Sequence, residues 1–222
     1  MTLTLCPHKL RNDIPEPPQF MARLPIDKRG YPVPWFVDWI DGVPEFRAMD
    51  PRKFKLAITE RRCWVCGNKL FPEQVFTVGP MCGINRISSE PPSHRQCAEY
   101  SAVACPFLSK PHMHRREDEE FNREKKKGAG LMIERNPGVT LLWYTRRHQL
   151  LHVSNGVLFK LGQAFKLAWY CQGRAATRDE IMESINSGLP ALRAAADRDP
   201  QPGAHEALDR EIERGLRLVP RR

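Results

Sequence analysis

Two short pairs of potential metal ligands constrain the fold of this chain more than any other feature. The first pair is Cys63-Trp-Val-Cys66, which Gly67 follows directly, and the second pair is His94-Arg-Gln-Cys97. A Cys-x2-Cys turn that ends in glycine is typical of a zinc knuckle, because glycine lets the backbone curl so that amides point at the thiolate sulfurs. Three cysteines and one histidine also make up a closed tetrahedral structural site. The sequence therefore predicts one zinc ion held by Cys63, Cys66, His94 and Cys97.

The residues around the pairs predict how this site is built. Ser93 is the expected N-cap of a helix that runs toward Ala104 and carries the second pair in its first turn. Residues 74–78 favour a strand, and Gly79-Pro80 favours a turn after it. A knuckle, a hairpin and a helix with two ligands resemble the treble-clef zinc-binding arrangement. A redox dithiol and an iron–sulfur cluster are the alternative uses of these cysteines.

Further cysteines and histidines leave a second site open. Cys82 and Cys105 could each replace one of the four ligands, or could build a second metal site with His112 and His114. The two histidines would point to one face of a strand, which suits one metal ion.

The positive charge of the chain favours contact with polyanions. Its 35 lysines and arginines against 26 acids give a formal net charge of +9. Nucleic acid is therefore one expected partner, and another protein is the other. Arg146 and Arg147 follow the strand-like residues 139–145, while Arg174 and Arg178 flank an expected helix start. We predict that these four arginines form one face that contacts nucleic acid.

The sequence contains no segment that is typical of a membrane or a secreted protein. No apolar run approaches the ~18 residues that a membrane helix needs. The first residues also lack a basic segment followed by a continuous apolar stretch, which a secretory signal requires. We expect a protein of the cytoplasm without membrane contact.

The fold class expected from these patterns is α+β, a zinc-stapled module plus a small antiparallel sheet packed with helices. We expect five segments: an extended, irregular arm rich in proline and aromatic residues over residues 1–50, a zinc-binding module over 51–114, a charged linker over 115–130, an antiparallel sheet plus helix over 131–200, and a charged C-terminal helix or tail over 201–222.

Local signals predict individual elements within these segments. Asp50-Pro51 begins a short helix as N-cap and first helical residue. Residues 139–145, 156–162 and 165–171 favour three strands of an antiparallel meander. Thr177-Arg-Asp-Glu180 has the spacing of a capping box, and Pro190 should end or kink the helix that follows. The last residues should form a charged helix that little ties down.

Several short phrases together resemble an uncharacterised family of bacterial and phage-type proteins. The resemblance spans residues 20–195 and implies one continuous architecture, without a reaction or partner. The phrases are Gly30-Tyr-Pro-Val-Pro-Trp-Phe36, Cys63-Trp-Val-Cys-Gly67, Gly79-Pro-Met-Cys82, Glu90-Pro-Pro-Ser-His94, Cys105-Pro-Phe-Leu108 and Gly173-Arg-Ala-Ala-Thr-Arg178.

Three hypotheses for function follow. The first is a zinc-stabilised binding or adaptor protein that contacts nucleic acid or a protein, since the zinc site is closed and the common catalytic motifs are absent, including His-Glu-x-x-His and the Walker A loop. The second is a metal-dependent nuclease or hydrolase that uses Cys82 or His94 with Glu90. The third is a structural subunit of a phage or mobile-element assembly, anchored to its partner by Trp35, Phe36 and Trp39.

Overall fold

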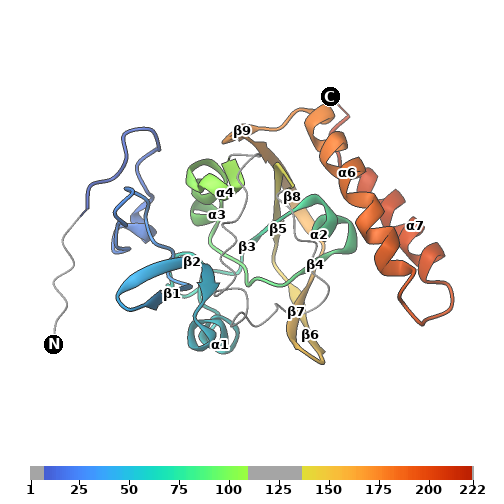
Figure 1. The fold of residues 1–222 in the computed structure, drawn as a ribbon, viewed down its shortest axis with the longest axis horizontal. Helices are drawn as coiled ribbons and strands as arrows, with labels where there is room; N and C mark the ends of the chain where they lie inside the picture. Colours follow the sequence, from blue (N-terminus) through green and yellow to red (C-terminus); the bar gives the residue numbers. More distant parts are fainter. Residues whose placement is uncertain (1–7, 110–136, 222) are drawn as a thin grey trace.

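The chain folds as a mixed helix and sheet protein in which the described residues form three small antiparallel sheets (Figure 1). The computed structural model describes residues 8–109 and 137–221. The expected linker over 115–130, together with His112 and His114, lies outside these residues. Among the described helices, none combines the length and the apolar character needed to cross a membrane.

The N-terminal segment is less irregular than its prolines predict. Residues 8–36 contain only one short 3-10 helix, η1 (Gln19–Met21), but strands β1 (Val37–Ile40) and β2 (Val43–Met49) then form an antiparallel hairpin. Asp41 and Gly42 join the two strands with φ of +50° and +76°, as in the tight turns that Asp-Gly pairs favour. The prediction of an irregular arm up to residue 50 is therefore wrong for this hairpin.

The first helix begins where its local signals place it. Helix α1 (Pro51–Thr59) starts with proline, and the side chain of the N-cap Asp50 accepts a hydrogen bond from the Arg52 amide at 2.8 Å. This satisfies one of the amides that a helix start leaves without a partner.

The central sheet joins distant parts of the chain. Its strands are β3 (Gln74–Val78), β5 (Val139–Thr145), β8 (Ala164–Cys171) and β9 (Arg174–Ala175), in that order. Strand β3 pairs along its whole length with β5. The expected metal-binding module and the expected sheet segment therefore share one sheet.

The strands after residue 137 do not form the predicted meander, because β5 pairs with β8 and not with the strand over residues 156–161. Strands β6 (His148–Val153) and β7 (Gly156–Leu161) pair with each other, β5 pairs with β8, and β4 (Ile87–Ser88) pairs with the outer side of β7. Close contacts stabilise the chain at the point where β5 is followed by β6 and β7 is followed by β8. There the Thr145 hydroxyl lies 2.9 Å from the carbonyls of Arg147 and Gln163, and a Cβ on Gly162 would lie 2.0 Å from the Arg147 carbonyl oxygen.

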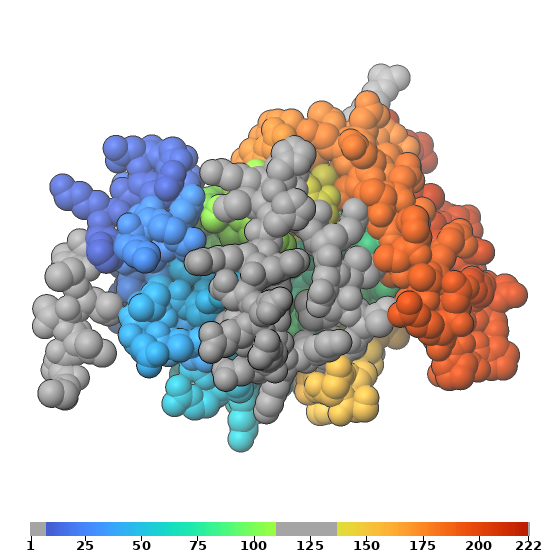
Figure 2. Space-filling view, viewed as in Figure 1, coloured from blue at the N-terminus to red at the C-terminus, as the bar shows by residue number. Residues whose placement is uncertain are grey.

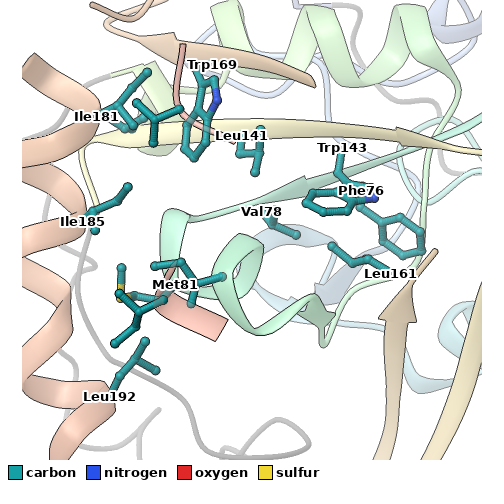
Figure 3. Packing of buried hydrophobic residues seen from close by; sticks show 14 of the residues in the cluster. Phe76, Val78, Met81, Leu141, Trp143, Leu161, Trp169, Ile181, Ile185 and Leu192 are labelled. Atoms are coloured by element: carbon teal, nitrogen blue, oxygen red, sulfur yellow. The ribbon is translucent and has the colours of Figure 1, made fainter. Parts of the chain in front are cut away.

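Helices cover both faces of the central sheet. Alternate residues of a strand point to opposite faces, and all seven residues of β5 are buried. Helices α3 (Arg95–Ala104) and α4 (Pro106–Ser109) pack against one face. Helices α2 (Pro80–Asn85) and α6 (Arg178–Ala196) pack against the other, and Figure 3 shows Ile181, Ile185 and Leu192 of α6 directed toward this core.

The C-terminal helices differ from the prediction in two ways. The capping box of Thr177 and Glu180 is present, but of the end or kink predicted at Pro190 the end is wrong, because α6 continues through this residue. Helix α7 (Ala204–Leu216) is also tied down: Gly215 packs against Ile84 of α2, and the indole of Trp169 donates to the Leu218 carbonyl at 3.3 Å. Figure 2 shows these helices at the opposite end of the molecule from the N-terminal residues.

Candidate metal centre

The first cysteine pair lies in a tight hairpin between α1 and β3. The Cys63 amide donates to the Asn68 carbonyl at 2.7 Å, and the Gly67 amide donates to the Cys63 carbonyl at 2.9 Å. The Cys66 amide points at the Cys63 sulfur at 3.5 Å. Gly67 has φ of +75°, and a Cβ there would lie 2.6 Å from the ring of Trp35. The turn therefore requires glycine both for its backbone angle and for the close approach of the indole.

The second pair is placed by a strand contact and a helix start. Ser93 and Val75 exchange two backbone hydrogen bonds, at 2.8 and 2.9 Å, which align the chain with β3. His94, and not Ser93, is the N-cap of α3, because the Ser93 backbone is occupied by this pairing. Cys97 lies in the first turn of α3, as predicted. The His94 amide reaches back to the Cys63 sulfur at 3.3 Å.

The two pairs meet in one buried cluster. The ligand atoms of Cys63, Cys66, His94 and Cys97 all lie within 4.8 Å of one another, and all four residues are buried. His94 Nδ1 faces the Cys66 sulfur at 3.3 Å, while Nε2 donates to the Lys69 carbonyl at 3.0 Å. A metal-ligating histidine characteristically donates its second ring N–H to a carbonyl, which fixes the tautomer that leaves the other nitrogen free to bind. The four residues form a potential metal-binding site.

The electrostatics of the cluster favour a thiolate. Burial alone raises the pKa of the Cys63 thiol, but hydrogen bonds from the other three residues outweigh it and lower the pKa below its ordinary value. Burial lowers the pKa of His94, but its hydrogen bonds to Cys63 and Cys66 raise the pKa to about 10. The pKa of Cys97 is raised, first of all by its hydrogen bonds to Cys63 and Cys66. The thiolate is the form of cysteine that binds metals, and a bound metal ion would displace the protons that His94 and Cys97 hold in its absence.

Aromatic rings from outside the two pairs cover the histidine. Phe20, in η1, stacks on His94 with ring centroids 4.8 Å apart and an angle of 20°. Phe71, in the loop after the knuckle, lies 5.1 Å from the same ring. Sequence reasoning did not find either ring, because neither carries a ligand atom and Phe20 is far away in the chain. Together they limit the access of water to the centre.

Protein-family models, curated proteins and solved structures give no match to this chain.

The other candidate ligands lie apart from this cluster. Cys82 is exposed on α2, and Cys105 is the C-cap of α3. Within residues 8–109 and 137–221, the Cys3His cluster is the one group of three or more histidine, cysteine or acidic residues with metal-binding geometry. The second site with His112 and His114 stays a prediction, because both histidines lie outside the described residues.

The four predicted arginines do not form one face. Arg146 and Arg147 follow the end of β5, whereas Arg174 lies beyond Cys171, which pairs with the first residue of β5. Six residue steps of ~3.3 Å separate the two ends of this strand by about 20 Å. Arg174 pairs with Glu180 at 2.6 Å and Arg178 donates to the Pro220 carbonyl at 2.6 Å, so both support the start of α6. The single face predicted from sequence is corrected by the strand register.

Proposed function

We propose that Cys63, Cys66, His94 and Cys97 bind one zinc ion in a closed structural site, and that the protein is a zinc-stabilised binding protein that contacts nucleic acid. The observation that carries the proposal is the complete set of four buried ligands from two separate elements.

The donor set supports zinc. Three sulfurs and one imidazole nitrogen are a common tetrahedral set for structural Zn²⁺, which has no geometric preference of its own. The knuckle, the strand β3 and the ligand-bearing start of α3 follow one another as in a treble-clef-like module. Such a module gains its folding free energy largely from the metal, since the ligands are brought together only in the folded chain.

The surroundings of His94 support a structural role and not a catalytic one. Four protein ligands leave no open position on a tetrahedral ion, whereas catalytic zinc keeps one for water. Both ring nitrogens of His94 face partners inside the protein, so this residue has no nitrogen left to act as a base. Cys82 and Glu90 stand outside the cluster, which argues against a hydrolase built on them with His94.

Nucleic acid is favoured over a protein as the ligand. The net charge of +9 suits a polyanion. Two of the three aromatic residues considered as anchors for another chain are used inside this one: Phe36 stacks on Trp64 at 4.8 Å, and Trp35 covers Gly67.

The zinc assignment is tested by metal analysis of the purified full-length chain. We expect one zinc ion per chain, and a cobalt-substituted sample with the absorption of a tetrahedral thiolate site. Cys97→Ser should lose the metal and unfold at a lower temperature, because it leaves three ligands. Cys82→Ser is the matched control, since this cysteine is exposed and outside the cluster. Unchanged zinc content and unfolding temperature in Cys97→Ser would contradict the assignment.

The nucleic-acid assignment is tested by titration of the zinc-loaded chain. Single-stranded DNA, duplex DNA and RNA are compared at two salt concentrations. Binding that weakens with salt supports the proposal, because release of counterions drives association with a polyanion. No binding to any of the three at low salt would overturn it.

A further inference from the structure

One end of the central sheet carries two exposed phenylalanines. Phe71, just before β3, is 55% exposed, and Phe165, at the start of β8, is 50% exposed. The register places the two at the same end of the sheet, because Gln74 of β3 pairs with Thr145, and Thr145 pairs with Ala164. Exposed rings of this size usually mark a binding surface when they are grouped and not scattered.

An irregularity in the sheet turns Phe165 outward. The register of β5 and β8 shifts between Tyr144 and Thr145, so Phe165 has no partner residue in the ladder. Such a bulge bends the strand and redirects the side chain. The ring of Phe165 then lies at 6.2 Å from Tyr144, and half of it remains open to solvent.

Cations alternate with these rings. The guanidinium of Arg146 lies over the Phe165 ring at 5.3 Å and pairs with Glu73 at 3.1 Å. The ammonium of Lys166 lies over the Tyr144 ring at 4.7 Å. On α3, Arg95 follows the metal ligand His94, whose ring is in contact with Phe71. We call Phe71, Arg95, Arg146, Phe165 and Lys166 the sheet-end surface.

The charge of this surface is positive. Its three cations are accompanied by Lys69 and Arg147, both exposed, against the two acids Glu73 and Glu99. The acids hold the cations in place through ion pairs, with Arg95 and Glu99 at 2.9 Å. The Arg146–Glu73 pair is exposed on both sides, and Arg95 and Lys166 are themselves exposed although Glu99 is half-buried, so a phosphate can approach all three cations.

We propose that the sheet-end surface binds single-stranded nucleic acid. Unpaired bases stack on Phe71 and Phe165, and phosphates contact Arg146, Lys166 and Arg95. The inference rests on the proposed function and names its site and its form of ligand. A single strand is required because the base faces of a duplex are already stacked, whereas an open strand offers a face to each exposed ring. The pattern of rings between cations matches a strand that carries bases and phosphates, whereas a purely apolar partner would remove these cations from water without offering them an anionic group.

The test measures the affinity of the full-length, zinc-loaded chain for a fluorescent oligothymidine and for a duplex of equal length. Phe71→Ala and Phe165→Ala should each weaken single-strand binding by about fivefold or more, as expected for the loss of one stacked base. Arg146→Glu should make the plot of log affinity against log salt less steep by about 0.7, the contribution of one phosphate contact in a single strand.

Matched controls separate the surface from general effects. Ile40→Ala and Val43→Ala remove similarly exposed apolar groups, 48% and 58% exposed, from the β1–β2 hairpin. Arg217→Glu makes the same charge change at another exposed arginine, which pairs with Glu213 on α7. The controls should bind as the unmodified chain does.

Two further measurements protect the result from folding defects. Phe71 contacts His94, so the zinc content of each variant is recorded. Phe165→Ala provides an independent variant, because the ring of Phe165 packs on Tyr144 and not on His94. Phe71→Trp and Phe165→Trp should retain binding, since indole also stacks on bases.

Each outcome has a defined meaning. If the chain binds single strands but the alanine variants and Arg146→Glu bind as the controls do, the sheet-end surface is overturned and the proposed function stands. If duplex binds as tightly as the single strand, the preference for single strands is overturned. If the unmodified chain binds no nucleic acid, the proposed function fails together with this inference.

Discussion

Replacement of Gly67 by alanine should destabilise the chain more than the same replacement of Gly42. The two glycines have nearly equal φ, +75° and +76°, so alanine costs a similar ~1–2 kcal/mol of left-handed backbone strain at each. Their surroundings differ. A Cβ on Gly67 would lie 2.6 to 2.8 Å from three ring atoms of Trp35, whereas a Cβ on Gly42 would meet nothing within 4 Å.

The size of the difference follows from this contact. The Trp35 ring would have to retreat by roughly 0.8 Å to restore an ordinary van der Waals distance. Its backbone cannot follow freely, because the Trp35 amide donates to the Val65 carbonyl at 2.7 Å. Overpacking of this kind costs ~1–3 kcal/mol. We expect a total loss of ~2–5 kcal/mol for Gly67→Ala and ~1–2 kcal/mol for Gly42→Ala.

The assay is urea unfolding of the zinc-loaded chain, followed by circular dichroism, with zinc content measured on the same samples. Equal losses in the two variants would refute the reasoning. A Trp35→Ala background gives a second check, because removal of the indole should abolish the difference between the two alanine variants if the contact causes it.

Three further predictions concern the packing and capping of the C-terminal helices. Gly215→Ala should lower the free energy of unfolding by ~1–3 kcal/mol, because its Cβ would lie 2.6 Å from Ile84, and urea unfolding measures the loss; an unchanged value would mean that α7 and α2 can separate at no cost. Ile185→Ala should cost ~2–5 kcal/mol, since Ile185 is 1% exposed in the core, and a loss near zero would place α6 elsewhere. Hydrogen bonds from Arg174 and the capping box lower the pKa of Glu180 to about 2 from its ordinary 4.5, so this carboxylate stabilises the folded chain above about pH 5 and the benefit disappears as pH falls toward 2. Glu180→Gln should accordingly lower the unfolding temperature at neutral pH, and its difference from the unmodified chain should shrink as the pH falls below 5; a difference independent of pH would contradict the assignment.

Short-range signals predicted the parts of the fold that depend on neighbouring residues. Asp50 and Pro51 begin α1, and Thr177 and Glu180 form the capping box of α6, because each motif satisfies helix amides within one turn. Gly67 marks the knuckle for the same kind of reason, since its backbone angle is a local requirement.

Other local signals were overridden by packing. Pro190 lacks a donor for one helical hydrogen bond, yet α6 continues through it, with Ile185 and Leu192 held in the core on either side. Residues 156–161 have a clear β pattern, which predicts a strand but not its partners. In the structure this strand, β7, pairs with β6 and β4. Partner choice depends on contacts that a strand makes only after the chain has folded.

By itself, the sequence determined the ligand set of the potential metal-binding site. The spacing of Cys63 and Cys66, and of His94 and Cys97, fixes two ligand pairs, because each pair lies within one turn of backbone. Only the tertiary structure decided that the pairs meet, that Phe20 covers His94, and that the predicted arginines stand at opposite ends of a sheet. The physical reason is that capping hydrogen bonds and backbone angles depend on neighbouring residues. Burial brings together residues that are far apart in the chain, and local sequence patterns do not predict those contacts.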